Sequence, residues 1–324
     1  MEAFEYAAPS SVKEAVGLLS STWGETDVLA GGTDLLSLMK ERVHTPKRVV
    51  SLRSVAGLRS VSGRAGLRIG ATATLSELLG SSAARENYPA LIQAAEGVSS
   101  PQMRAMGTVG GDLLQRPRCW YFRNGYGLLG KDGDGKSLAP IGENRYHAIL
   151  GNKGPAYFVN ASSLAPALIA LGASVTLAGP DGEREIEVEK LYQTPNSDGD
   201  RENALRPNEI LTAIIVPAAA GVVSATYEVR QRQLMDWPLA TASVALKLSG
   251  GSVQSARVVL GHVAPTPWRS SEAEQALMGK SVSEDTALAA AKAALASATP
   301  LSGNKHKVQL ARVAVKRAIL RAAG

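Results

Sequence analysis

The sequence contains a single cysteine, Cys119, among its 324 residues. One thiol can form neither an internal disulfide nor a metal cage made of cysteines alone, so both are excluded. This scarcity fits a protein of a reducing compartment. Aromatic residues are also scarce, at 5% of the chain, yet three of them follow Cys119 directly in the stretch MGTVGGDLLQRPRCWYFRNGYGLLG, residues 106–130. The stretch is therefore a candidate ligand cradle, a former metal site, or a loop held by arginines.

Long apolar runs are absent as well. No segment approaches the roughly 18 consecutive apolar residues that a membrane-spanning helix needs. The first residues, MEAFEYAAPSSVKEAV, are acidic and mixed, without the basic and apolar regions of a signal peptide. We therefore expect no membrane insertion and, by default, a cytoplasmic location.

Positive charge is only slightly in excess. The chain carries 35 Lys and Arg against 29 Asp and Glu, a net charge of +6 and a pI of about 9.4. No zinc-finger spacing and no RNA-binding aromatic–basic motif accompany this excess, so nucleic acid is not an expected partner. Much of the excess falls in the last predicted helix, 305–322, which we expect to present either a solvated basic face or a surface for an acidic patch on a partner subunit.

Short strand-like and helix-like segments alternate along the chain, which predicts an α+β fold. Residues 1–217 form a body of two small lobes with a glycine-rich excursion at 124–154, and AAAG at 218–221 is the predicted linker. Residues 222–324 form a smaller α+β domain, a β-meander followed by helices. TLSELL, from Thr74, carries a capping box with Glu77, and SGGS predicts a β-hairpin. Strands are predicted at 28–30, 48–52, 67–71, 156–160, 174–177 (before a GPDG turn), 209–216, 240–248 and 253–263, and helices at 10–19, 34–41, 74–79, 89–96, 163–171, 271–278, 285–297 and 305–322.

The segment VLAGGTDLLSLMK, residues 28–40, predicts a strand, a Gly-Gly turn and a helix. Glycine permits close approach of a ligand to the backbone, and free amides at a helix start suit a phosphate group. Thr33 adds a hydroxyl, whereas Asp34 would repel phosphate unless it caps the helix or binds a sugar hydroxyl. A plain strand–turn–helix corner is the alternative interpretation.

A second segment, MGTVGGDLLQ, has a similar design, with Gly110-Gly111 followed by Asp112 and two leucines. Two phosphate-sized cradles in one body indicate a pyrophosphate held from two sides. Neither segment matches the G-x-G-x-x-G fingerprint of nicotinamide dinucleotides. The spacing therefore favours a dinucleotide bound outside the Rossmann plan.

Five ordered motifs make the whole chain recognisable: AGGTDLL, TVGGDLLQRPRCWYFR, ENRYHAILGN, SSLAPALIALGA and GHVAPTPWR. Together they resemble the FAD-binding (medium) subunit of the molybdenum hydroxylases, the xanthine dehydrogenase, carbon monoxide dehydrogenase and aldehyde oxidoreductase family, with most likeness to the aldehyde oxidoreductase type. The resemblance implies a two-lobed vanillyl-alcohol-oxidase-type FAD domain followed by a C-terminal α+β domain.

The resemblance also implies which residues bind FAD. The first segment would wrap the pyrophosphate through backbone amides, and the second would complete the cradle with Thr108 as a hydroxyl donor. Asp112 stands where the family often has Asn. Ser163 stands where the family commonly has an acid that touches the cofactor, so a carboxylate contact is not expected there. The candidate cofactor-binding residues are Leu29, Ala30, Gly31, Gly32, Thr33, Asp34, Leu35, Leu36, Thr108, Gly110, Gly111, Asp112 and Ser163.

Some relatives hold a [4Fe–4S] cluster in an insertion that begins at the RC of the second motif. Such a cluster takes four thiolates, and the loop at 124–154 holds no cysteine. We therefore expect no [4Fe–4S] cluster held by this chain alone. We expect the Arg-rich motif to be structural, with Arg116, Arg118 and Arg123 bridging backbone carbonyls or FAD phosphate.

The function implied by the resemblance is electron transfer by an oxidoreductase subunit. A large partner subunit with the molybdenum cofactor would hydroxylate an aldehyde or N-heterocycle, and a small partner subunit with two [2Fe–2S] clusters would pass electrons to FAD in this chain and on to an external acceptor. No catalytic acid or base is required of this chain. A stand-alone flavin oxidase and a cofactor-free scaffold subunit remain alternatives, and a signal-bearing partner could carry the folded chain to the periplasm.

The other candidate residues have simpler interpretations. The segment from Asp132 lacks the glycine and flanking helices of a calcium loop. The four histidines show no paired metal spacing, and we expect no Cys–His nucleophile pair and no metal site; His147, inside a motif, has the best claim to a site role. Trp237, in the segment 230–240, is either a core residue at a domain junction or lies near the flavin edge.

Overall fold

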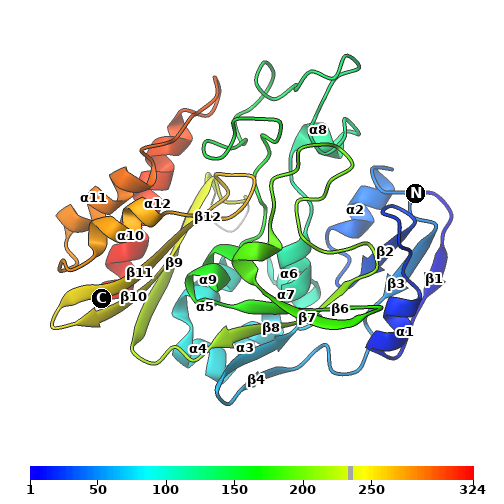
Figure 1. The fold of residues 1–324 in the computed structure, drawn as a ribbon, viewed down its shortest axis with the longest axis horizontal. Coiled ribbons are helices and arrows are strands. Elements are labelled where there is room, and N and C mark those ends of the chain that lie inside the picture. Colours follow the sequence, from blue (N-terminus) through cyan, green and yellow to red (C-terminus); the bar gives the residue numbers. More distant parts are fainter. Residues whose placement is uncertain (233–235) are drawn as a thin grey trace.

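The computed structural model describes residues 1–232 and 236–324, which form a mixed helix-and-sheet fold. The described residues contain three sheets: a parallel sheet near the N-terminus, an antiparallel sheet in the middle of the molecule, and a second antiparallel sheet near the C-terminus. Figure 1 shows the third sheet with its helices at one end of the molecule and the first sheet at the other. The predicted α+β class is confirmed.

The first lobe is a three-stranded parallel sheet in the order β1-β3-β2. Its buried apolar residues, such as Ala15 and Val50, join one core cluster with Ile210 of the second lobe. Strand β2 lies at the sheet edge and runs directly into the first Gly-Gly segment. The elements are β1 (Glu5–Ala7), α1 (Val12–Gly17), β2 (Thr26–Leu29), α2 (Leu35–Lys40) and β3 (Arg48–Ser51).

The second lobe is a five-stranded antiparallel sheet in the order β4-β5-β8-β6-β7. The predicted capping box is confirmed: the Glu77 amide donates to Thr74 Oγ1 at 3.2 Å, and the Thr74 amide donates to Glu77 Oε2 at 2.8 Å. The strands are β4 (Val61–Gly63), β5 (Gly66–Gly70), β6 (Ser174–Gly179), β7 (Gly182–Glu187) and β8 (Ile210–Pro217); the helices are α3 (Leu75–Gly80), α4 (Ser82–Asn87), α5 (Pro89–Gly97), α6 (Pro101–Met106), α7 (Val109–Leu114), α9 (Ala165–Ala170) and the 3₁₀ helix η1 (Val188–Leu191).

The C-terminal unit is a four-stranded antiparallel sheet in the order β12-β11-β10-β9. One face contacts α5 and α9, and the other packs on the C-terminal helices. This double covering explains why the first seven residues of β10 are all buried. The elements are β9 (Val222–Val229), β10 (Ala240–Ser249), β11 (Ser252–Gly261), β12 (Trp268–Arg269), α10 (Ser271–Leu277), α11 (Glu284–Ala294) and α12 (His306–Ala323).

Several predictions of secondary structure need correction. The hairpin at SGGS and the GPDG turn are confirmed, but residues 156–160 form no strand. Their backbone instead pairs with loop residues, as when the Asn160 amide donates to the Ala264 carbonyl at 2.9 Å. Strand β9 and the short strands β1, β4, β7 and β12 were not predicted, and neither were the short helices α4, α6, α7 and α8.

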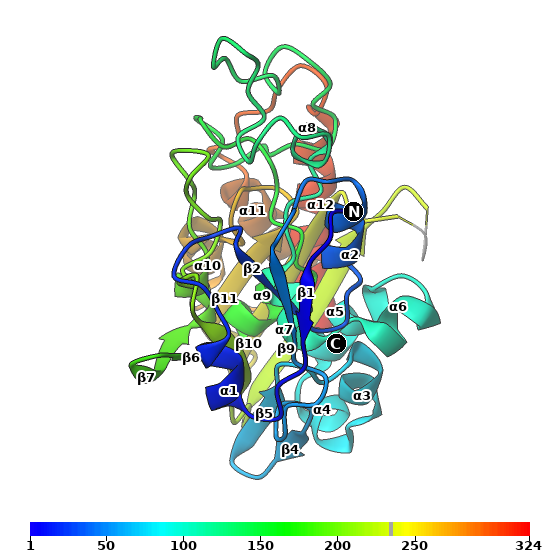
Figure 2. The same ribbon diagram turned by 90° about the vertical axis from the view of Figure 1, so that its right-hand side faces the viewer.

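The excursion at 124–154 rises above the sheets in both views (Figures 1 and 2). It follows α8 (Trp120–Arg123) and is mostly irregular. Leu128 and Leu129 are buried in a small cluster with Leu38 and Phe122, and Ile149 and Leu150 are buried in the core of the C-terminal unit. These contacts hold the excursion against both ends of the molecule.

Candidate FAD-binding site

The first Gly-Gly segment offers unused backbone donors. It leaves the end of β2 at Leu29 and enters α2 at Leu35, with Asp34 as the residue before the helix. Within residues 1–232 and 236–324, the amides of residues 31–35 donate to no protein acceptor. Helix α2 has only six residues, so these amides rather than a helix dipole are what the segment presents to a ligand.

Close packing explains the glycines of this segment. A Cβ on Gly31 would lie 2.0 Å from the carbonyl oxygen of Met106, so no other residue fits there without moving the backbone. Gly32 has φ +76°, a conformation that L-residues rarely adopt. The first segment is therefore held against the end of α6 by its lack of side chains.

The second Gly-Gly segment is not a turn, as the sequence had suggested. Gly110 and Gly111 lie in the first turn of helix α7, and Thr108 caps that helix by accepting from the Gly111 amide at 3.0 Å. The amides of Val109, Gly110 and Asp112 donate to the carbonyls of Ala73, Ala71 and Thr108. The expectation of two amide cradles of the same design is therefore wrong, because the second segment uses its donors inside the protein.

Both segments nevertheless line one cavity of about 210 Å³. Gly31, Gly32, Thr108 and Gly111 form adjacent parts of its wall, and Thr108 keeps a hydroxyl hydrogen to donate. The cavity extends to Trp23, over which the Arg201 guanidinium lies at 4.3 Å, a pair that no sequence signal indicated. Of the candidate residues, Ala30, Gly31, Gly32, Thr33, Asp34, Leu35, Thr108, Gly110 and Gly111 line this cavity.

The remaining four candidates lie outside this wall. Leu29 ends β2, and Leu36 is exposed on α2. Asp112 lies behind the wall, where it accepts from the Ser162 hydroxyl at 2.5 Å and from the Leu164 amide at 3.0 Å. Burial raises the pKa of this carboxyl, and hydrogen bonds from residues 162–164 partly offset that rise. Ser163 is itself buried and donates its amide to Asp112 at 3.4 Å. Asp112 thus ties α7 to the start of α9.

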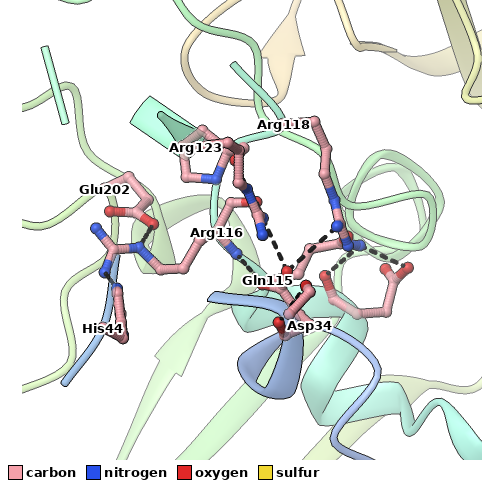
Figure 3. A network of polar contacts seen from close by, with 10 residues as sticks. Asp34, His44, Gln115, Arg116, Arg118, Arg123 and Glu202 are labelled. Atoms are coloured by element: carbon pink, nitrogen blue, oxygen red, sulfur yellow. Dashed lines mark hydrogen bonds and ion pairs between the residues drawn. The ribbon is translucent and has the colours of Figure 1, made fainter. Parts of the chain in front are cut away.

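Asp34 is held by the arginines of the second motif (Figure 3). Its carboxylate accepts from Arg123 Nη2 at 2.8 Å and from the Arg116 amide at 2.8 Å, and it lies 3.3 Å from Arg118 Nη1. It makes no side-chain capping bond to α2. Two guanidinium groups therefore offset the negative charge of Asp34 beside the cavity. They would reduce the repulsion between Asp34 and a phosphate group that the sequence led us to expect.

The three arginines differ in their other contacts. Arg123 donates to the carbonyls of Pro117 and Arg116 at 2.9 and 3.1 Å, as predicted for this group. Arg116 pairs with the buried Glu202 and lies 3.0 Å from His44 Nε2. Arg118 donates to Gln115 and lies over the Trp237 ring at 4.6 Å. Each of the three guanidinium groups therefore has protein partners.

Cys119 contacts His147, a contact that the sequence did not predict, although no Cys–His nucleophile pair was expected. The Sγ atom lies 3.2 Å from His147 Nε2. Burial raises the pKa of the thiol and lowers the pKa of His147 to about 4. Both groups are therefore neutral at neutral pH, so the pair is not an activated nucleophile.

The other sequence candidates have structural roles. Asp132 Oδ1 accepts from the amides of Asp134 and Lys136 in an exposed turn. Within the described residues, no group of three or more His, Cys, Asp or Glu side chains could hold a metal ion. Of the segment 230–240, residues 233–235 lie outside the described residues, whereas Trp237 is 40% exposed and not a core residue.

Two family models match the chain in succession. Residues 2–219 match the FAD binding domain in molybdopterin dehydrogenase, and residues 225–322 match the CO dehydrogenase flavoprotein C-terminal domain. The chain is 30% identical over 321 residues to the carbon monoxide dehydrogenase medium chain of Hydrogenophaga pseudoflava, covering 98% of this chain and 96% of that one. It is 32% identical over 317 residues to the aldehyde oxidoreductase FAD-binding subunit PaoB of Escherichia coli (strain K12), covering 96% of both.

Solved structures match the chain over nearly its whole length. A carbon monoxide dehydrogenase from Hydrogenophaga pseudoflava has a TM-score of 0.78 at 29% identity, and a Cu,Mo-CO dehydrogenase has 0.79 at 27%; each match covers 99% of this chain and 97% of the other. The chain therefore belongs to the family of FAD-binding subunits of the molybdopterin dehydrogenases. It is an oxidoreductase subunit with an FAD-binding domain, and the resemblance read from its motifs is confirmed.

Across residues 1–232 and 236–324, no helix is both long and apolar enough to cross a bilayer.

Proposed function

We propose that this chain is the electron-transfer subunit of a multi-subunit molybdenum hydroxylase that oxidises an aldehyde or an N-heterocycle. Its partners are a small iron–sulfur subunit with [2Fe–2S] clusters and a large subunit with the molybdenum cofactor. FAD, when bound, accepts electrons one at a time and delivers them in pairs to an external acceptor. The medium-chain names of the relatives support this assembly.

The observation that carries the proposal is the set of free amides at residues 31–35 on the wall of the 210 Å³ cavity. Backbone donors without protein acceptors are suited to phosphate oxygens, because each would otherwise need water. We assign the pyrophosphate to the segment 29–36. Thr108, Gly110 and Gly111 form the adjacent part of the wall, and Asp112 and Ser163 hold that part from behind.

The charged residues around the cavity have a positioning role in this proposal. Arg118 and Arg123 offset the Asp34 carboxylate at 3.3 and 2.8 Å, so that an anionic ligand can approach residues 31–35. Their contacts also fix the second motif to α2. No side chain of this chain acts as a general acid or base.

We further propose the division 1–217, 218–221 and 222–324 for the FAD domain, linker and C-terminal domain. The start of β9 at Val222 and the family matches at 2–219 and 225–322 support it. We assign the complex to the cytoplasm by default, or to the periplasm when a signal-bearing partner exports it folded.

The first test is the visible absorption spectrum of the purified chain, before and after anaerobic dithionite. Two flavin bands that bleach cleanly, with FAD identified by chromatography after heat release, would support the proposal. A broad brown shoulder would mean that iron is bound with thiolates from a second chain. A folded, colourless protein that does not take up added FAD would contradict the proposal and favour a scaffold role.

A matched pair of variants tests the cradle. Gly32→Ala adds a methyl group at φ +76°, 3.1 Å from the Leu36 side chain and 3.2 Å from the Leu29 side chain, whereas Gly57→Ala adds one at φ +81° where nothing lies within 4 Å. Both carry a similar backbone strain of about 1 kcal/mol. We expect Gly32→Ala to bind FAD about tenfold more weakly and Gly57→Ala to bind it normally. Equal FAD affinity in the two variants would refute the assignment of the pyrophosphate to residues 29–36.

A further inference from the structure

A cavity of about 500 Å³ lies between the second lobe and the C-terminal unit. Its wall takes residues 170–172 from the end of α9, residues 217–219 and 222 from the segment around the start of β9, and residues of β10, β11 and β12. Figure 1 shows α9 beside the C-terminal sheet, with which it is in contact. No candidate FAD-binding residue lines this cavity, and boundaries between packed units are common places for small-molecule sites.

A row of three cations crosses the face of the sheet that lines the cavity. Lys247 lies on β10, Arg257 on β11 and Arg269 on β12. Lys247 pairs with Ser255, and Arg269 pairs with Val259. Arg257 lies two residues from each of these partners on β11, so the three cations share one face of the sheet. Within the described residues, the wall of the cavity contains no acid.

Two of the three cations have no carboxylate partner. Arg269 pairs with Glu274 at 2.8 Å and with Glu189 at 3.6 Å, so its charge is already compensated. Lys247 is exposed and forms no ion pair within residues 1–232 and 236–324. Arg257 donates from Nη1 to a carbonyl, whereas its Nε and Nη2 have no partner in the same ranges and are not sealed from solvent. The cavity therefore carries two positive charges that an anion could offset.

Arg257 is held in place before any ligand binds. Its Nη1 donates to the Ile169 carbonyl at 3.1 Å, which ties the guanidinium to the end of α9. A Cβ on Gly172 would lie 2.9 Å from the same Nη1, and Gly172 has φ +74°, so the glycine leaves room for the guanidinium. A guanidinium that is already fixed loses less side-chain entropy when it binds an anion.

The linker beside the cations adds backbone donors. Ala218 and Ala219 line the cavity, and their amides donate to no acceptor in the described part of the chain. Ser255 lines it as well and contributes a hydroxyl group. Amides, a hydroxyl and two cations together suit an anion, because charge-assisted hydrogen bonds are the strongest that such donors make.

The spread of these donors favours phosphate over carboxylate. They come from β10, β11 and the linker, and three terminal oxygens in a tetrahedral arrangement can reach groups on separate segments. A carboxylate has two coplanar oxygens, which a single guanidinium can satisfy. Apolar side chains of Leu171, Pro217 and Val222 form another part of the wall, so the remainder of the ligand is expected to be organic and apolar.

We propose that this cavity binds a small organic molecule that carries a phosphate group. Arg257 and Lys247 bind the phosphate oxygens together with the linker amides, and the apolar part of the wall contacts the organic group. The ligand contacts both the second lobe and the C-terminal unit, so its binding stabilises their packing. The site is separate from the electron transfer proposed above and does not depend on it.

The test is calorimetric titration of the full chain, loaded with FAD, with phenyl phosphate at about pH 8, where the phosphate is a dianion. Loading with FAD occupies the first Gly-Gly segment, which could itself take phosphate. We expect saturable binding of one phenyl phosphate per chain. Inorganic phosphate, which lacks the apolar part, and benzoate, which lacks the phosphate, should each bind about tenfold more weakly.

A matched pair of linker variants locates the binding. Ala218 and Ala220 are both exposed, but only Ala218 lines the cavity. Each change to Asp adds one carboxylate to the same segment without removing a contact of Arg257. We expect Ala218→Asp to weaken phenyl phosphate binding about tenfold through repulsion, and Ala220→Asp to weaken it by about twofold or less.

A second pair tests the free cation. Lys247→Gln removes a positive charge from the cavity wall, whereas Lys13→Gln removes one from an exposed position on α1. We expect Lys247→Gln to weaken phenyl phosphate binding about fivefold and Lys13→Gln to leave it unchanged. Both side chains are exposed, so neither variant is expected to disturb folding, and thermal unfolding checks that.

Four results would overturn the inference. They are no saturable binding of phenyl phosphate, equal affinity in Ala218→Asp and Ala220→Asp, binding of benzoate as tight as that of phenyl phosphate, and binding of inorganic phosphate as tight as that of phenyl phosphate. A chain that takes up no FAD would instead contradict the proposed function, and its absorption spectrum reports that before any titration. The paired variants would still locate phenyl phosphate on such a chain.

Discussion

The two Gly-Gly segments have similar sequences and opposite hydrogen-bonding states. In the first, residues 31–35 keep their amides free beside the cavity. In the second, Gly110 and Gly111 begin a capped helix and donate to Ala71 and Thr108. A glycine pair before an acid and two leucines therefore indicates close backbone packing in both places, but free donors only in the first.

The glycines also serve different contacts. A Cβ on Gly31 would meet the Met106 carbonyl at 2.0 Å, whereas one on Gly110 would meet the Ala71 carbonyl at 2.8 Å. The first pair brings a strand end against α6, and the second brings α7 against the turn after β5. The first segment therefore lines the cavity with free amide donors, whereas the second lines it with closely packed backbone.

The largest expected effect is the pH dependence of stability, and it comes from groups outside the two Gly-Gly segments. The buried histidines His147 and His262, which lie outside both segments, contribute to the pH dependence of stability. Both have pKa values lowered from 6.5, to about 4 for His147 and about 3 for His262. Through these two groups the unfolded chain binds more protons than the folded chain below pH 6.5, so their contribution to stability is full above that pH and falls as the pH drops toward the folded values. Buried Lys307, whose pKa is lowered from 10.5 to about 7, acts in the same direction at higher pH, so stability also falls between about pH 10 and pH 7.

At about 1.4 kcal/mol per pKa unit, His147 alone removes about 3 kcal/mol by pH 4. Urea unfolding at several pH values measures the effect. His262→Asn should flatten the acid limb, since Asn tolerates positive φ, while the exposed His306→Asn should leave it unchanged. An acid limb identical in all three proteins would show that carboxylates alone set it.

The next largest effect concerns the first glycine. Gly31→Ala places a methyl group against the Met106 carbonyl, and we expect it to cost about 3 kcal/mol of unfolding free energy. Gly110→Ala should cost less, because its nearest contact is longer. Gly17→Ala, with nothing within 4 Å, is the control and should be neutral. Denaturant unfolding gives the order, and a larger loss for Gly110→Ala would reverse the comparison.

A smaller effect on stability is expected at Asp112, which lies in the second Gly-Gly segment and behind the cavity wall. Asp112→Ala removes the acceptor for the Ser162 hydroxyl and the Leu164 amide, leaving buried donors unsatisfied at a cost of about 2 kcal/mol. Asp181→Ala at an exposed position should change little. Thermal unfolding with and without FAD measures both. A variant of Asp112 as stable as the parent would mean that α7 does not depend on this contact.

The smallest effect on stability is expected at Asp34 in the first Gly-Gly segment. The Asp34–Arg123 pair is part-buried, and a double-mutant cycle with Asp34→Ala and Arg123→Ala should give a coupling of about 1 kcal/mol that decreases as salt is added. Additive single and double changes would show that the arginines are held by their backbone contacts alone.

The elements predicted well are those with strong local signals. The Thr74–Glu77 capping box and the SGGS hairpin depend on residues a few positions apart, so the sequence is enough to place them. The short strands β1 and β4 lack such signals, because three residues give no periodicity. Helix α7 contains two glycines, which disfavour helix, and its formation depends on the Thr108 cap and packing on Ala71.

The candidate site also has parts that the sequence indicated and parts that it could not. The sequence indicated Gly31, Gly32 and Thr108 as parts of one ligand site, and the structure places them on one cavity. It could not show that Arg118 and Arg123 offset Asp34 across more than eighty positions, or that Cys119 meets His147. Those pairings depend on where the excursion folds back.

The sequence by itself determined the α+β class, the family, and the glycine segments, because motifs and short-range patterns carry that information directly. Only the tertiary structure decided which amides remain free and which carboxylate is neutralised. Hydrogen bonds and burial are completed by groups distant in the chain, so the state of each donor and each titrating group is fixed only when the lobes have packed.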